Sequence, residues 1–224
     1  MGKKRTICMA QMKGDLTYHG ETVLSYSIEY PVFHPVCRSP LARLNRYYRT
    51  LAEQYRHAVT TQLFGEAVRQ YRISQRSQLP MPVYQAVVEW RCTYLDGCVA
   101  SLYSDRYEYA GGAHGITIRA SQTWDLDKAV RLPLSCLIAP CCNAKEESLR
   151  SVRAQIGERS SDFFDNADFL AGDTWNPARF YCTPEGLVVY YQQYDIAPYS
   201  SGIPEFCIPY TGCVADPLSV CGER

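Results

Sequence analysis

One histidine and three carboxylates are the residues of this chain whose types could support acid–base catalysis. His114 lies in the segment Ala-Gly-Gly-Ala-His-Gly at residues 110–115, and Glu108, Asp125 and Asp127 flank that segment. An imidazole and a carboxylate act together in a hydrolase only when the fold brings them within hydrogen-bonding reach. No spacing in this sequence places His114 and a carboxylate within that distance of each other. A hydrogen-bonded structural histidine is therefore the preferred interpretation of His114, and we assign no catalytic residue.

The eleven cysteines are a second source of possible chemistry. Cys136, Cys141 and Cys142 form the tightest group, but no Cys-x-x-Cys pair occurs and no histidine lies near them. Their spacing therefore matches no familiar metal-ligand pattern, and we predict neither a metal nor another cofactor. Without an export signal, we interpret the cysteines as buried small hydrophobic residues or free thiols.

Other catalytic signatures are missing from the sequence. It contains no nucleophile elbow, no His-Glu-x-x-His and no phosphate loop. A non-enzymatic binding module is therefore the first hypothesis. Two alternatives stay open: a hydrolase that uses His114 with a carboxylate or a thiol, and a domain whose motifs meet conformational requirements only.

The strongest candidate for a binding surface is the stretch from Tyr181 to Tyr210, which contains six of the eighteen tyrosines. Tyrosine has a rigid apolar ring and a polar tip, so it suits a recognition surface, and it also suits a core whose hydroxyl groups reach water. Pro184-Glu185-Gly186 predicts a hairpin turn, and the arm that follows is apolar on both faces, as in a central strand. After Asp195, two prolines and a glycine predict a loop.

A glycine-rich segment makes a conformational demand of its own. Gly111, Gly112 and Gly115 fall within five positions, which indicates positive φ or a close backbone approach, as in a tight crossing between strands. We treat these glycines, with His114, as a structural motif.

The remaining pattern predicts an α+β fold. Alternation at residues 22–33 indicates a first strand ended by Pro31 and Pro35, and Ser39-Pro40 begins an amphipathic helix that reaches about Ser74. Alternation at residues 83–95 followed by Asp96-Gly97 predicts a hairpin that returns to residue 109. Further strand character covers residues 116–126, and a capping pattern at Asn143 predicts a shorter helix to about residue 157.

We therefore expect a long amphipathic helix and a shorter helix packed on a mainly antiparallel sheet. The predicted organisation is a poorly ordered tail at 1–20, contributing an edge strand at most, a strand-and-helix subdomain at 21–80, a sheet subdomain at 81–212 and a tail at 213–224. The two subdomains are expected to pack as one globular unit. Residues 158–178 are expected to be irregular linking structure.

Composition excludes some classes of partner. The chain has 23 basic and 23 acidic residues, which argues against nucleic acid or an anionic membrane as the main partner. No stretch reaches the roughly 18 apolar residues of a membrane span, and the apolar run from Ile7 to Ala10 is too short for a signal peptide. As written, the chain is expected to be cytoplasmic.

Two blocks of this sequence resemble a known bacterial family. The first is Ser101 to Gly115, with Tyr-Glu-Tyr-Ala-Gly-Gly-Ala-His-Gly, and the second is Tyr181 to Tyr210, with Tyr-Asp-Ile-Ala-Pro-Tyr, Gly-Ile-Pro-Glu-Phe and Ile-Pro-Tyr. Both resemble the domain of unknown function that forms the extracytoplasmic sensor of RsiV-type anti-sigma factors. The resemblance covers about residues 22–210, without the membrane helix and sigma-binding segment of those sensors. The family usually has a Thr-Gly-Lys-like turn where this chain reads Asp-Lys-Ala-Val at 127–130.

The resemblance implies a partner. Some relatives recognise lysozyme, and others occur beside cell-wall deacetylase domains, so the expected partner is a lysozyme-like protein or a peptidoglycan fragment. Carried over by position, the binding residues would be Tyr194, Pro198, Tyr199 and Pro204. Tyr107 and Tyr109 of the first block are secondary candidates.

Overall fold

The computed structural model describes residues 5–36 and 40–220 and has the predicted α+β fold. The chain divides into two compact units, each described here by itself. Unit 1 comprises Met1–Trp90 and Asp105–Ile118, and unit 2 comprises Arg91–Ser104 and Arg119–Arg224. Among the described helices, none is both long and apolar enough to cross a membrane.

Unit 1 begins with a long antiparallel hairpin. Strand β1 (Thr6–Tyr18) pairs with β2 (Glu21–His34) from Thr6 opposite His34 to Tyr18 opposite Glu21. The turn at His19-Gly20 has positive φ at both residues, as type I′ hairpin turns require. The prediction for residues 1–20 allowed an edge strand at most, and β1 is an edge strand; the expected poor order was wrong for Thr6–Tyr18, which is paired along its whole length.

Pro31 does not end the first strand, in contrast to the prediction. It lies inside β2 opposite Met9 of β1. The pairing of β2 with its other neighbour, β3, extends only from Leu24 to Ile28, so Pro31 lies where β2 has a neighbouring strand on one side only. A missing backbone N–H is tolerated at such an edge-like position.

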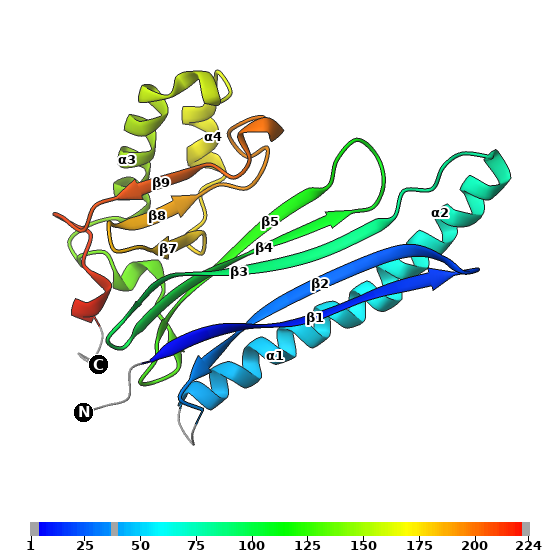
Figure 1. Cartoon of the computed structure of the whole chain (residues 1–224). Coiled ribbons are helices and arrows are strands. Elements are labelled where there is room, and N and C mark those ends of the chain that lie inside the picture. The colour runs from blue at the N-terminus through cyan, green and yellow to red at the C-terminus, as the bar shows by residue number, and fades with distance from the viewer. Residues whose placement is uncertain (1–4, 37–39, 221–224) are drawn as a thin grey trace. The chain divides into compact units, whose positions relative to one another are not determined.

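The predicted long helix is confirmed. Helix α1 (Pro40–Ala58), the π-helical turn η1 (Val59–Leu63) and α2 (Phe64–Ser77) follow one another without a break, along β1 and β2 (Figure 1). Leu44, Tyr48 and Val59 of the apolar stripe are buried, whereas Leu51 is 36% exposed. The predicted N-cap, Ser39, lies outside the described residues.

Strands β3 (Tyr84–Asp96), β4 (Val99–Tyr109), β5 (Ile116–Asp125) and β6 (Val130–Arg131) complete a six-stranded sheet in the order β1 to β6. The alternation predicted for β3 is confirmed, since Tyr84, Ala86 and Val88 are buried. The hairpin at Asp96-Gly97 is also confirmed, with φ of 50° at Gly97. The division between the units passes through β3, β4 and β5, whereas we had predicted a boundary at residues 80/81.

Unit 2 contains a second, three-stranded antiparallel sheet of β7 (Phe180–Cys182), β8 (Leu187–Tyr190) and β9 (Glu205–Ile208). As predicted, β8 is the central strand. The described part of unit 2 also contains helices α3 (Ala144–Glu158) and α4 (Ala167–Asp173). The Asn143 side chain caps the N-terminus of α3, as predicted. Among the described residues of this unit there are also four short 3-10 turns, namely η2 (Leu134–Cys136), η3 (Ser160–Asp162), η4 (Tyr199–Ser201) and η5 (Pro217–Val220).

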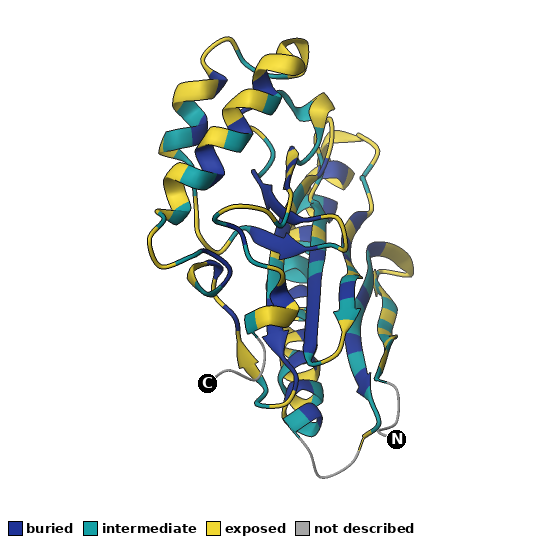
Figure 2. Ribbon diagram, turned by 90° about the vertical axis from the view of Figure 1, so that its left-hand side faces the viewer, coloured by how far each residue is buried: buried dark blue, intermediate teal, exposed yellow. Residues whose placement is uncertain are grey.

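Tyr181 of β7, Tyr190 of β8 and Tyr191, which directly follows β8, belong to the core. Tyr181, Tyr190 and Tyr191 are all less than 5% exposed. The Tyr191 hydroxyl donates to the Ala171 carbonyl at 3.0 Å, so its polar tip is satisfied inside the protein. Burial differs between the strands (Figure 2): every residue of β7 and β8 is buried, whereas β1 contains no buried residue.

The interpretation of the cysteines as unpaired was wrong for three of them. Cys142 and Cys213 form a disulfide across 71 positions of sequence, and Cys98 is also disulfide-bonded. The sequence did not reveal this pairing because it depends on a tertiary contact. An antiparallel bridge between Ile138 and Val214 places the two distant segments side by side. The predicted tail at 213–224 is therefore packed in its described part, where Val214 is 5% exposed.

Candidate functional site

The loop that follows β8 in unit 2 is fixed at its start by one aspartate. Asp195 accepts a hydrogen bond from the Gln192 backbone N–H at 2.9 Å, and its own N–H donates to the Gln192 carbonyl at 3.1 Å. The same carboxylate forms an ion pair with Arg179. These contacts close a tight turn around residues 193 and 194.

A second clamp ties this turn to β5. The Gln192 side-chain oxygen accepts from the Arg119 backbone N–H at 2.9 Å, and the Gln192 amide donates to the Arg119 carbonyl at 2.6 Å. The Arg119 side chain, 8% exposed, pairs with Glu205 and lies over the Tyr103 ring, 3.9 Å from its centroid. The base of the loop is thus connected to two sheets.

At the tip of this turn, Tyr194 has an unusual backbone. Its φ is +67° and it is 52% exposed. A left-handed conformation costs about 1 kcal/mol or more for a residue with a side chain, and such conformations often occur at ligand-binding sites. The Tyr194 ring lies 6.0 Å from the Tyr199 ring, with 33° between their planes. We call Tyr194 and Tyr199 the aromatic pair.

Pro198 and Pro204, the two prolines predicted to bind a partner, lie in different surroundings. Pro198 is half-buried and directly precedes the 3-10 turn that carries Tyr199. Pro204 is buried, and its carbonyl accepts from the Tyr191 N–H at 3.0 Å. Pro198 therefore belongs with the aromatic pair, whereas Pro204 anchors the far end of the loop to β8.

Sequence reasoning missed a segment that lies against this loop. The Phe164 N–H donates to the Ile196 carbonyl at 3.1 Å, and the Ser201 hydroxyl donates to the Asp162 carbonyl at 2.8 Å. The segment was predicted as irregular linking structure, but it contains η3 and α4. Phe169 on α4 is 71% exposed.

This segment, residues 160–173, is also acidic, and we call it the acidic segment. Four exposed aspartates lie in it, namely Asp162, Asp165, Asp168 and Asp173. No lysine or arginine occurs between residues 160 and 178. This run of negative charge without a basic residue is the sequence feature from which the acidic segment could have been predicted.

The glycine-rich segment is the loop between β4 and β5 in unit 1. Gly111 and Gly112 have φ of +89° and +92°, and a Cβ on Gly115 would lie 2.6 Å from the Glu108 carbonyl oxygen and also overlap the Tyr107 ring. The Tyr109 hydroxyl donates to the Gly112 carbonyl at 3.1 Å. Tyr107 and Tyr109 thus contact their own loop, and they belong to a different unit from the aromatic pair.

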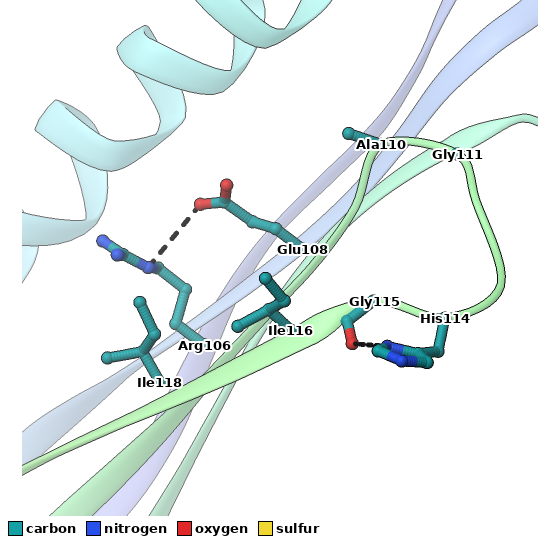
Figure 3. Close-up of a pocket in the computed structure, with 8 residues that line it drawn as sticks. All are labelled: Arg106, Glu108, Ala110, Gly111, His114, Gly115, Ile116 and Ile118. Atoms are coloured by element: carbon teal, nitrogen blue, oxygen red, sulfur yellow. Dashed lines mark hydrogen bonds and ion pairs between the residues drawn. The ribbon is translucent and has the colours of Figure 1, made fainter. Parts of the chain in front are cut away.

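A pocket of about 280 Å³ lies beside this loop (Figure 3). Glu108 accepts a hydrogen bond from the Tyr55 hydroxyl at 2.7 Å and lies 3.6 Å from the Arg106 side-chain nitrogen. Burial, followed by this bond, raises the pKa of Tyr55. The Glu108 carboxylate and the His114 ring point in different directions, and His114 lies 3.1 Å from the Gly115 carbonyl instead.

The other candidate carboxylates belong to unit 2. Asp125 is 3% exposed and accepts from the backbone N–H groups of Asp127 and Lys128 at 2.9 and 3.1 Å. It therefore organises the turn between β5 and β6. In that turn Ala129 has φ of +51°, at a turn where the resembled family has glycine.

A second cavity, of about 430 Å³, lies in unit 2 between β5, the start of α3 and residues 177–180. Its apolar wall comes from Leu132, Leu134 and Phe180, and Arg131 lines it as well. No residue singled out from the sequence lines this cavity.

Comparisons with known proteins agree with this fold. Residues 139–211 match the family described as "Protein of unknown function (DUF3298)", and residues 19–117 match the family described as "Deacetylase PdaC". None of the curated proteins matches the chain.

Two solved structures are similar over nearly the whole chain. A member of the DUF3298 family from Bacteroides fragilis NCTC 9343 has a TM-score of 0.73 at 17% identity, with 96% of each chain covered. A DUF3298 family protein from Pseudomonas aeruginosa PAO1 has a TM-score of 0.63 at 20% identity, with 98% of each chain covered. The chain therefore contains a DUF3298-family domain, preceded by a region similar to PdaC.

Proposed function

We propose that this protein is a non-enzymatic binding domain whose recognition surface is centred on the aromatic pair. The observation that carries the proposal is Tyr194, a half-exposed tyrosine held in a left-handed backbone by the Asp195 turn, beside a second aromatic ring. Aromatic side chains that are fixed before binding lose little conformational entropy when a partner covers them.

The partner we propose is a lysozyme-like protein. The resemblance to RsiV-type sensors suggests it, and the negative charge of the acidic segment would favour a partner with a basic surface. Exposed aspartates beside an exposed Phe169 would attract such a partner and give it an apolar contact. A peptidoglycan fragment is the other partner that the resemblance suggests, and its sugar rings could stack on Tyr199.

We also propose that the protein works outside the cytoplasm, contrary to the expectation from its N-terminal sequence. The Cys142–Cys213 disulfide and the disulfide at Cys98 support this location. Disulfides form and persist in oxidising compartments and are rare in the cytosol. Alkylation of free thiols during extraction measures whether these cysteines are oxidised in the cell, as an extracytoplasmic location requires.

The direct test is a calorimetric titration of the purified protein with a c-type lysozyme, with lysozyme activity followed in parallel. Tyr199→Ala and Tyr194→Ala should each weaken binding about 30-fold, corresponding to about 2 kcal/mol for a central aromatic contact. Tyr109→Ala in unit 1 is the matched control and should leave affinity unchanged. Thermal melts of all variants show whether an effect on affinity is an effect on folding.

Two results would contradict the proposal. Absence of binding to lysozyme would remove this partner, and the same titration with soluble peptidoglycan fragments would then decide whether a glycan takes its place. Binding that is insensitive to both tyrosine substitutions would remove the aromatic pair as the recognition surface.

A hydrolase that uses His114 and a carboxylate is the second candidate, because the name of the family matching residues 19–117 is that of a deacetylase. The assay is release of acetate from N-acetylated peptidoglycan by wild type and His114→Ala. Turnover that His114→Ala abolishes without lowering the melting temperature would favour this candidate. No turnover, together with a lower melting temperature for His114→Ala, would favour a structural histidine.

A further inference from the structure

The Cys142–Cys213 disulfide, the Glu147 carboxylate and the neighbouring thiol of Cys141 lie where the chain enters α3 in unit 2. The ligand atoms of Cys142, Cys213 and Glu147 all lie within 4.8 Å of one another. The Cys141 sulfur lies 3.7 Å from the Cys142 sulfur and carries a free, exposed thiol. Glu147 lies in the first turn of α3, five residues after Cys142. We call these four residues the sulfur cluster.

The backbone holds the cluster together independently of the disulfide. The Ala139 N–H donates to the Cys213 carbonyl at 2.8 Å, and the Ala215 N–H donates to the Leu137 carbonyl at 2.9 Å. The Cys142 N–H donates to the Ala139 carbonyl at 2.9 Å. If the Cys142–Cys213 bond is reduced, these hydrogen bonds keep the two thiols side by side.

We propose that the sulfur cluster, once reduced, is a binding site for a soft divalent cation such as zinc. Two thiolates bound to one zinc ion at about 2.3 Å in tetrahedral geometry lie about 3.8 Å apart. The separation of the Cys141 and Cys142 sulfurs is close to that value. Three thiolates and one carboxylate also carry the same formal charge as the four thiolates of a common structural zinc site.

The two states are related by a two-electron step. A dithiol reductant breaks the Cys142–Cys213 bond, giving two thiols and a cyclic disulfide of the reductant. The cation then binds as the thiols of Cys141, Cys142 and Cys213 lose their protons to solvent. Glu147 contributes a carboxylate oxygen, and Arg150, which now pairs with Glu147, competes for that group. The same residues thus hold either a disulfide or a metal ion.

Cobalt(II) is the probe, because its thiolate complexes have charge-transfer and tetrahedral ligand-field absorption. The full chain is reduced with dithiothreitol, freed of reductant by gel filtration under argon, and titrated. We expect one equivalent of cobalt to bind the reduced chain and none to bind the oxidised chain, with zinc displacing the cobalt. Glu147→Gln should weaken binding about tenfold or more, and Cys142→Ser should abolish it.

Cys207→Ser, which removes an exposed thiol elsewhere in unit 2, is the matched control and should bind as wild type does. Circular dichroism of the reduced chain reports folding with and without the metal. The proposal is overturned if the reduced chain gives no thiolate–cobalt band, if Cys142→Ser binds equally well, or if the band persists in urea. A reduced chain that unfolds and is not refolded by the metal also overturns it.

Discussion

Unit 1 and unit 2 have different kinds of elements and different kinds of restraint. Unit 1 contains a long hairpin, a helix that continues through η1, and a loop whose shape is set by glycine. Unit 2 contains strands of three or four residues in its second sheet, and a disulfide and two ion pairs restrain segments that flank these strands. Short elements with few local hydrogen bonds depend on such distant restraints.

The glycine loop of unit 1 and the loop after β8 in unit 2 appear equally distinctive in the sequence but differ in structure. The glycine loop of unit 1 turns its tyrosines and His114 toward its own backbone. The loop of unit 2 is clamped at its base and leaves Tyr194 half-exposed. An unusual backbone thus closes a turn in one loop and presents a side chain in the other.

Loss of the disulfide should have the largest effect and should be confined to unit 2. Replacing Cys142 and Cys213 together by serine releases a restraint across 71 positions, which is worth about 4 kcal/mol in the chain-entropy account. Urea denaturation measures the change, and hydrogen exchange locates it. Equal loss of protection in β1 and β2 would show that the units do not differ in this way.

Two alanine substitutions in the glycine loop should differ in a predictable order. Gly115→Ala should cost about 3 kcal/mol, because the new methyl group overlaps Tyr107 and the Glu108 carbonyl. Gly112→Ala meets no atom within 4 Å and should cost only about 1 kcal/mol, for its positive φ. Thermal melts give both values. Equal costs would mean that the overlap at Gly115 relaxes, and neither variant should alter binding at the aromatic pair.

Alkaline pH should destabilise the protein through a buried thiol of unit 2. Burial raises the pKa of Cys182 to about 11 from its ordinary value of 9.0. Because the folded-state pKa is the higher one, this stability is complete below about pH 9 and is lost as the pH rises toward 11. The loss at pH 10 is about 1.4 kcal/mol. Urea denaturation at pH 8 and pH 10 measures it, and Cys182→Ala should remove this part of the pH dependence.

The smallest effect should come from giving the turn of unit 2 a glycine like those of unit 1. Ala129 has φ of +51°, where a side chain is unfavourable. Ala129→Gly should stabilise the protein by up to about 1 kcal/mol, because relief of that strain exceeds the added freedom of the unfolded chain. A lower melting temperature for this variant would show that the Asp125 turn does not strain Ala129.

Local patterns were sufficient for the regular elements. Alternation predicted β2 and β3, the apolar stripe around Tyr48 predicted the long helix, and Asp96-Gly97 predicted a hairpin, because each signal lies within one element. Pro31 was misjudged because its effect depends on whether a neighbouring strand pairs with that position.

Local sequence patterns predicted only part of the candidate site. The sequence indicated Tyr194, Pro198 and Tyr199, but it could not separate them from buried Pro204 or from the core tyrosines, since tyrosine and proline occur in both settings. Nor could it place Asp162 and Phe164 beside the loop, because two hydrogen bonds across more than thirty residues decide that contact.

The sequence by itself therefore determined the fold class, the long helix, the main hairpins and the loops that need glycine, all of which follow from short-range periodicity and turn chemistry. Only the tertiary structure decided that Cys142 pairs with Cys213, that Glu147 lies beside them and that the acidic segment contacts the loop that carries the aromatic pair. These contacts join residues far apart in the chain, and chain folding sets their distances.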